Sequence, residues 1–180
     1  MENRNHKDSL FIDLFCKDKE GKQNFISLYN ALHNTNLDLA TTTVQEVNIE
    51  NVLYMALSND IAMLVDNRLV VLVEHQSTIN ENMPLRLLEY VSRIYEQLVP
   101  SEDRYEKKMI KIPYPEFFVF YNGTEDYPVE TELRLSDAFI FPDEKYNVKS
   151  NDLTIEIKVK IININSDKQS PILKQCKKLE

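Results

Sequence analysis

Two carboxylates and an amide lie at the ends of two adjacent apolar runs, and their types and spacing could support chemistry. Asp60 precedes IAMLV, and Glu74 and Gln76 follow LVVLV. A run of Leu and Val is typical of a strand buried on both faces. A carboxylate at the end of such a strand is costly to desolvate unless something compensates its charge. A divalent cation shared by Asp60 and Glu74 would do so, because Mg²⁺ and Mn²⁺ prefer hard oxygen ligands.

The turn signal Asp66-Asn67 lies between the two runs and predicts a β-hairpin. A two-residue loop pairs Asp60 with Val73 and turns it away from Glu74. A three-residue loop instead places Asp60 directly opposite Glu74, at about 4.5–5.5 Å. A bulge in either strand has the same effect as the third loop residue. A shared cation therefore requires a three-residue loop or a bulge, and we predict one of the two.

The residues beside Glu74 each fit more than one role. Strand alternation places Gln76 on the same face as Glu74 and His75 on the other. Gln76 could orient a water, or it could make a structural hydrogen bond. The backbone carbonyl of His75 could be a third metal ligand, while its side chain is more typical of a packed or solvated histidine. For Asp60 and Glu74 the alternative to a metal site is a solvent-exposed pair of acids.

Contacts to phosphate would have to come from a few basic residues. The formal net charge of -8 argues against a general polyanion-binding surface. Arg86 and Arg93 lie on one predicted helix, where ion pairs with neighbouring glutamates explain them equally well. The best basic patch is Lys107, Lys108 and Lys111, although lysines beside so many acids are normally just solvated.

The rest of the chain alternates between helical and strand patterns, which predicts an α/β fold with helices on both faces of a central mixed sheet of about four strands. Helices are expected over residues 9–15, 24–34 and 84–99 and from residue 170, with a loop over 17–23. Strands are expected from residue 44, in the hairpin, and over 116–123, 130–135 and 153–163. The third helix should bury a stripe of Leu85, Leu88, Val91, Tyr95 and Leu98.

Length and composition indicate a single domain over residues 1–180, with 43% hydrophobic residues to build a core. The two glycines exclude Gly-rich phosphate loops.

Cys16 and Cys176 form no metal or redox motif and fit a reducing cytoplasm. MENRNHKD lacks the apolar part of a signal peptide, and no apolar run could span a bilayer, so we expect a cytoplasmic protein without a membrane partner. The last amphipathic pattern stops midway, which predicts truncation at the C-terminus.

Taken together, these segments resemble a known nuclease superfamily. Asp60 is followed after thirteen residues by EHQS and then by PLRLLEY. The set is completed by four longer segments, which are KDSLFIDLF, SNDIAMLVDNRLVVLVEHQST, MPLRLLEYVSRIYEQL and FFVFYNG. The set resembles the PD-(D/E)XK nucleases, and more narrowly the Rpn family of bacterial recombination-promoting nucleases and putative transposases. The likeness covers most of the chain.

The resemblance implies a PD-(D/E)XK core, with a four-stranded mixed sheet flanked by helices, that cleaves DNA phosphodiester bonds with Mg²⁺ or Mn²⁺. On this basis Asp60 and Glu74 match the metal-binding acids, and Gln76 takes the place of the motif lysine. Asp8 aligns with an accessory acid, although Asp is also a favoured N-cap for the first helix. Family members are longer than this chain. DNA is the expected partner, and assembly into a homo-oligomer stays open.

The change from lysine to glutamine leaves a second function open. A lysine would offer a positive charge to the phosphate or to the attacking hydroxide, whereas Gln76 offers only a hydrogen bond. Catalysis would then depend more heavily on the metal to acidify its water. The alternative is a binding or assembly module that keeps the nuclease fold with weak catalysis or none.

Overall fold

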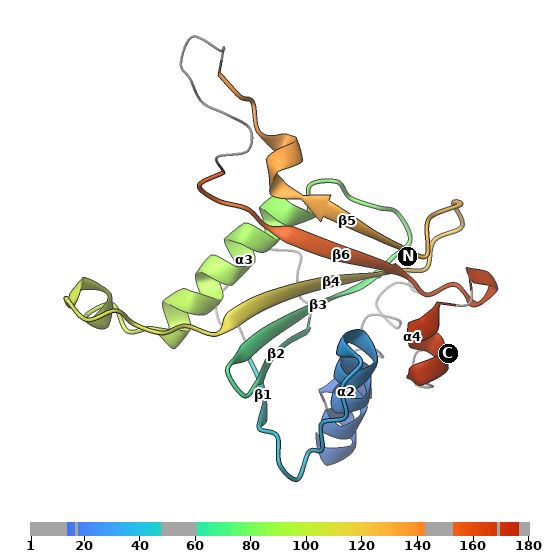
Figure 1. The fold of residues 1–180 in the computed structure, drawn as a ribbon, viewed down its shortest axis with the longest axis horizontal. Coiled ribbons are helices and arrows are strands. Elements are labelled where there is room, and N and C mark those ends of the chain that lie inside the picture. The colour runs from blue at the N-terminus through green and yellow to red at the C-terminus, as the bar shows by residue number, and fades with distance from the viewer. Residues whose placement is uncertain (1–13, 17, 48–60, 143–152, 169, 177–180) are drawn as a thin grey trace, which may run out of the picture.

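Six strands form one mixed sheet in a computed structural model that describes residues 14–16, 18–47, 61–142, 153–168 and 170–176, with only the backbone for 71–75. The strands are β1 (Val44–Glu46), β2 (Ile61–Val65), β3 (Arg68–Gln76), β4 (Tyr114–Tyr121), β5 (Glu130–Arg134) and β6 (Lys158–Asn163). Their order is β1-β2-β3-β4-β6-β5 (Figure 1). The β3–β4 and β4–β6 pairs are parallel and the others antiparallel. The mixed α/β sheet is confirmed, with six strands rather than about four.

Helices cover both faces of this sheet, as predicted. They are α2 (Asp18–His33), α3 (Met83–Leu98) and α4 (Pro171–Gln175). The run FFVFY in β4 shows why two layers are needed, because successive side chains of a strand point to opposite faces. Phe118 and Phe120 pack in the cluster that contains α2 and α4 residues. Phe117, Val119 and Tyr121 pack in the cluster that contains the buried face of α3.

The start of α2 differs from the prediction. Residues 17–23 were expected to form a loop, but the helix begins at Asp18. The Asp18 carboxylate accepts hydrogen bonds from the N–H groups of Glu20 (2.8 Å) and Gly21 (3.3 Å), so it caps the first turn. Gly21 looked like a loop residue but packs closely, since a Cβ there would lie 3.0 Å from the Cys16 backbone. The predicted helix over residues 9–15 lies mostly outside the described residues.

The buried stripe of α3 also differs. Its buried residues are Met83, Pro84, Leu87, Tyr90, Val91 and Ile94. Of the predicted stripe, Val91 is buried and Leu88 and Tyr95 pack against the same cluster, but Leu85 (47% exposed) and Leu98 (36% exposed) are wrong. The apolar residues of this helix occupy a wide arc, and several helical stripes fit it. Contact with the sheet selects the one that begins at Met83.

The last strand is shorter and more buried than expected. β6 begins at Lys158, and Leu153 and Ile155 before it are exposed. It lies between β4 and β5, and its apolar residues are buried against both helical layers. β5 lies at the sheet edge. None of the described helices is long and apolar enough to cross a membrane.

Candidate functional site

The hairpin loop between β2 and β3 has two residues. Val65 is the partner of Arg68, so only Asp66 and Asn67 lie between the strands. The predicted three-residue loop is therefore wrong. Asp66 adopts a left-handed φ of 52°, which Asp tolerates better than most residues. It exchanges hydrogen bonds with the backbone of Thr43 through its N–H (2.9 Å) and its carboxylate (3.0 Å). These contacts fix the short loop against the residue that precedes β1.

β3 has a bulge-like register shift against β4, whereas the described β2–β3 register shows none, so a facing pair of Asp60 and Glu74 stays a prediction. Val73 pairs with Val119 and Gln76 pairs with Tyr121, so β3 advances three residues while β4 advances two. The extra residue reverses the strand's alternation. Gln76 consequently faces α3, the side on which Tyr121 packs. The argument that placed Glu74 and Gln76 on one face does not hold across this bulge.

Gln76 presents an oxygen that has no described donor. Its Nε2 donates to Sδ of Met83 at 3.2 Å. A thioether only accepts hydrogen bonds, so this contact fixes the orientation of the amide. Oε1 is then buried, and it accepts no hydrogen bond from the described part of the chain. Leaving such an acceptor unsatisfied costs about 1–3 kcal/mol, so a water or ligand is expected beside it.

A second side chain reaches the same sulfur. Arg86 lies one turn into α3, and its Nη1 donates to Sδ of Met83 at 3.3 Å. The two contacts bring the Gln76 and Arg86 nitrogens within 6.5 Å of each other, the sum of their distances to the sulfur. No described carboxylate lies within 4.0 Å of Arg86. Arg93 instead pairs with Glu96 at 3.1 Å on the exposed side of the helix, as the ion-pair interpretation predicted.

The turn after β4 closes against this site. The N–H of Asn122 donates to the carbonyl of Gln76 at 3.2 Å. A Cβ on Gly123 would lie only 2.2 Å from the Ser77 carbonyl oxygen, so this approach requires glycine. Asn165 Nδ2 donates to the Gly123 carbonyl at 2.9 Å and connects the end of β6. The sequence analysis missed Gly123, although its position directly after a buried strand was a signal.

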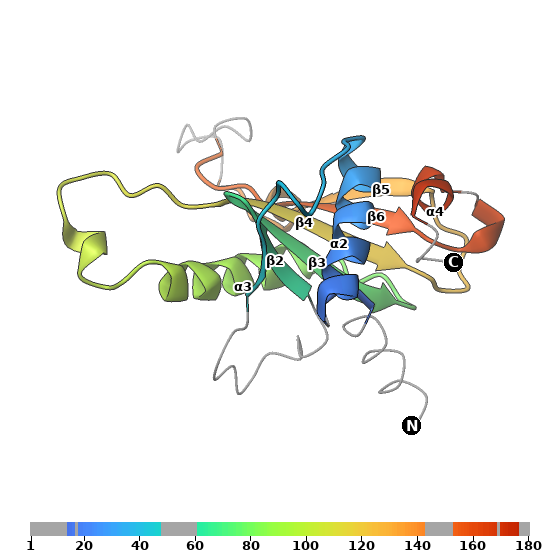
Figure 2. The same ribbon diagram turned by 90° about the horizontal axis from the view of Figure 1, so that it is seen from below.

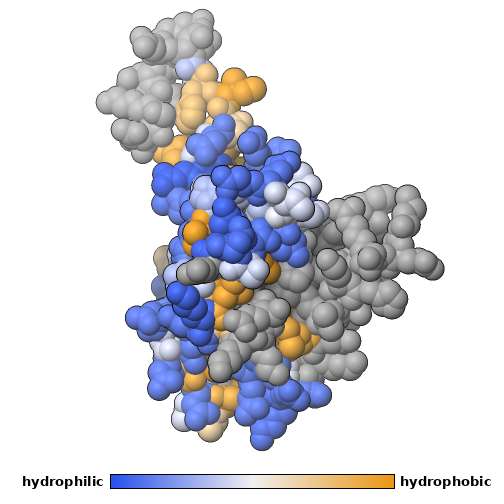
Figure 3. Space-filling view, turned by 90° about the vertical axis from the view of Figure 1, so that its right-hand side faces the viewer, coloured by the Kyte–Doolittle hydropathy of each residue, from blue (hydrophilic) through white to orange (hydrophobic). Residues whose placement is uncertain are grey.

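The carboxyl ends of the parallel strands β3, β4 and β6 therefore meet at Gln76. Open α/β sheets bind ligands at this end of their strands. Figure 3 shows this end of the molecule, where the surface is mainly hydrophilic with apolar residues between the polar ones.

A family model described as "Putative transposase, YhgA-like" matches residues 5–169. The chain belongs to this family. No curated protein and no solved structure matches it. The YhgA-like match includes all six strands and both α2 and α3, so the site around Gln76 lies within the family's shared region.

Several predicted site residues of this YhgA-like chain cannot be placed. Asp8 and Asp60 lie outside the described residues, and only the backbone is described for Glu74 and His75. Their predicted roles stay predictions. Within the described ranges, no group of three or more His, Cys, Asp or Glu could hold a metal ion.

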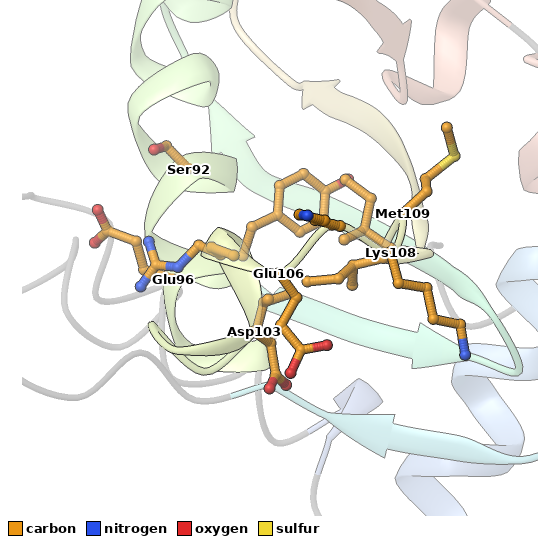
Figure 4. A pocket seen from close by; sticks show the side chains of 12 residues that line it. Ser92, Glu96, Asp103, Glu106, Lys108 and Met109 are labelled. Carbon is orange, nitrogen blue, oxygen red and sulfur yellow. The ribbon is translucent and has the colours of Figure 1, made fainter.

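The basic patch lies far from Gln76. Residues 100–113, here called the arm, follow α3, and Lys107, Lys108 and Lys111 are exposed on it. α3 carries the chain about 24 Å from Met83 to the arm. Figure 2 shows the arm at the end opposite the arrowheads of β4 and β6. A cavity of about 530 Å³ between arm and α3 is lined by both acids and bases (Figure 4). The structure does not bring these lysines to the site.

A separate polar cluster lies at the amino ends of β3 and β4. His33 has both ring nitrogens engaged. Its Nε2 lies 2.9 Å from Oε1 of Glu116, and its Nδ1 lies 3.0 Å from the Tyr29 carbonyl. Arg68 donates to the Tyr29 hydroxyl at 2.9 Å. Both partners of His33 are acceptors, which favours the doubly protonated ring and holds the last turn of α2 on β4.

This cluster predicts a pH-dependent stability. Burial lowers the pKa of His33, but hydrogen bonds to Glu116 and to the Tyr29 carbonyl outweigh it, and the net pKa is raised above 6.5. Stabilisation by protonated His33 should be complete below pH 6.5 and disappear as the pH rises through the raised value. Urea unfolding of wild type and His33→Gln at a series of pH values measures this contribution to the free energy of unfolding. The wild type should lose more free energy of unfolding across this window, and Glu116→Gln should reduce the loss. Parallel pH profiles for all three proteins would refute the assignment.

Proposed function

We propose that this chain is a metal-dependent nuclease with a PD-(D/E)XK core that hydrolyses phosphodiester bonds of DNA. The transposase family supports action on DNA, and the order Asp60, Glu74, Gln76 supports this nuclease type. The observation that carries the proposal is the Gln76 oxygen, which is buried without a described donor where three parallel strands end. Such an oxygen fits either a hard cation or the water that a cation holds.

In this proposal, the carboxylates of Asp60 and Glu74 hold Mg²⁺ or Mn²⁺, the His75 carbonyl is a further ligand, and Asp8 is an accessory acid. The cation would acidify a water and stabilise the charge that develops on the phosphate. The bulge that precedes Gln76 changes the face toward which the following side chain of β3 points, and such bulges are common beside active sites.

Gln76 acts on the attacking water. Because Met83 holds Nε2, the amide offers its oxygen to the site as an acceptor. It can accept a hydrogen bond from the water and aim the water's lone pair at phosphorus. The new P–O bond then forms as one ester P–O bond breaks, and the leaving oxygen takes up a proton.

The arm is the proposed second contact with DNA. The arm begins at the far end of α3, about 24 Å from Met83 along the helix, which corresponds to about seven base pairs of duplex. The DNA backbone would thus be contacted, away from the bond that is cut, by Lys107, Lys108 and Lys111. Arg93 is a weaker candidate for this role because Glu96 already neutralises it.

A plasmid-nicking assay tests the proposed function. Wild type should cleave supercoiled and linear DNA in Mg²⁺ or Mn²⁺ but not in EDTA. Gln76→Ala should be about 10²-fold slower, the scale of one positioned catalytic group. Gln23→Ala removes an exposed glutamine from α2 and should match wild type. A wild type that binds DNA but is no faster in any metal than in EDTA would instead support the binding-module alternative, which the neutral amide at position 76 favours.

A further inference from the structure

Met83, Arg86 and Gln76 form a unit that the sequence pattern does not show. Sδ of Met83 is fully buried and accepts from both side chains, at 3.2 Å from Gln76 and 3.3 Å from Arg86. Sulfur is a weak acceptor, so this contact orients the guanidinium without neutralising it. Most of its five N–H donors stay available for a stronger, anionic acceptor.

Arg86 also differs from the other arginines of the strands and α-helices. Arg68, Arg93 and Arg134 each have a carboxylate within 4.0 Å. Arg86 is half-buried, and within the described ranges its guanidinium donates to the Met83 thioether and has no carboxylate within 4.0 Å. Arginine is weakly hydrated and forms bidentate contacts with phosphate, so a partly buried, unneutralised guanidinium suits a phosphate ligand.

The start of α3 strengthens the local positive potential. The first turn of this 16-residue helix contains no acid, and its N-cap Asn82 makes no side-chain capping bond. Arg86 therefore adds its charge at the positive end of the helix dipole, where a cation is unfavourable unless an anion binds nearby. The carboxyl ends of the strands and this helix start converge through the Gln76–Met83 contact.

We propose that Arg86 contacts the scissile phosphate and supplies the fixed positive charge that Gln76 lacks, with Met83 as the positioning residue for both. This inference rests on the proposed nuclease function. An arginine stays protonated, so Arg86 acts by electrostatic contact with the phosphate oxygens and not as a base.

Charge-swap variants test this directly. Arg86→Gln should lower kcat/KM by about 10²-fold, as for loss of one electrostatic group, and Arg86→Met, which keeps the apolar stem, should do the same. Arg86→Lys should keep most of the activity. The double variant Gln76→Lys/Arg86→Gln should recover much of it, because the charge returns at position 76. Arg134→Gln, a loss of charge on the exposed edge strand, is the matched control and should equal wild type.

DNA binding in EDTA gives a readout without metal or catalysis. Fluorescence anisotropy with a short duplex at several salt concentrations should show a salt slope smaller by about one for Arg86→Gln and Arg86→Met, but not for Arg86→Lys or Arg134→Gln. Thermal melts check that each variant folds. If folded Arg86→Met has wild-type rates and salt slopes, the inference about Arg86 is overturned. The proposed nuclease function would still stand. A wild type inactive in every metal would overturn the proposed function and the catalytic role of Arg86 with it, whatever the salt slopes.

Discussion

Replacing Glu74 by Gln is expected to slow metal-dependent DNA cleavage by about 10²-fold or more, the scale for removing one electrostatic group from an active site. The free energy of unfolding should stay equal or rise. Without a cation, two nearby carboxylates repel each other, and active-site groups are commonly held at a cost to stability. Asp60→Asn should behave in the same way because it removes the other charge of the pair.

Paired measurements of rate and stability separate a metal ligand from a structural acid. Glu132→Gln removes a carboxylate from the exposed face of β5 and should change neither the rate nor the metal requirement. Plasmid nicking and urea unfolding are measured for all three variants. A large loss of stability in Glu74→Gln would assign that carboxylate a structural role and remove it from the metal site.

Gly123→Ala is the second change with a large expected effect. The added Cβ would lie 2.2 Å from the Ser77 carbonyl and 2.4 Å from the Tyr121 hydroxyl. Since one obstacle is backbone, the turn after β4 must move away from the end of β3. We expect a loss of about 1–3 kcal/mol in the free energy of unfolding, as for overpacked cores. Cleavage should fall as well, because the hydrogen bond from Asn122 to Gln76 lies beside this approach.

The other glycine supplies the control. A Cβ on Gly21 would lie 3.0 Å from the nearest backbone atom, and alanine gains helix propensity at this helical position. Gly21→Ala should therefore cost less stability than Gly123→Ala and should leave cleavage unchanged. Urea unfolding and plasmid nicking of both variants check this order. Equal effects on cleavage would mean that Gly123 contributes only to general stability.

Local patterns predicted much of the fold. The two apolar runs around Asp66-Asn67 predicted the hairpin, and Pro84 marked the start of α3 to within one residue. The loop length was not predictable, because the left-handed Asp66 is fixed by contacts with Thr43, which lies 23 residues away. The start of α2 was missed for a related reason, since Gly21 suits packing against the preceding segment and not a loop.

The candidate site was predictable in one part only. The EHQS segment identified Gln76, and the requirement for two facing acids led to the prediction of a bulge. The contacts of Gln76 and Arg86 with Met83 are tertiary, and nothing in helical spacing shows that a buried sulfur will join them. The stripe of α3 shows the same limit, because its apolar arc allows several faces and contact with the sheet selects one.

Mn²⁺ soaked into crystals of the wild-type protein tests the central claim most directly. Anomalous difference density should show one strong peak bound by the carboxylates of Asp60 and Glu74, on the side toward which Gln76 directs its buried oxygen. A crystal saturated with Mn²⁺ that shows no peak there, with the two carboxylates on opposite faces of the sheet, would contradict the metal-dependent mechanism.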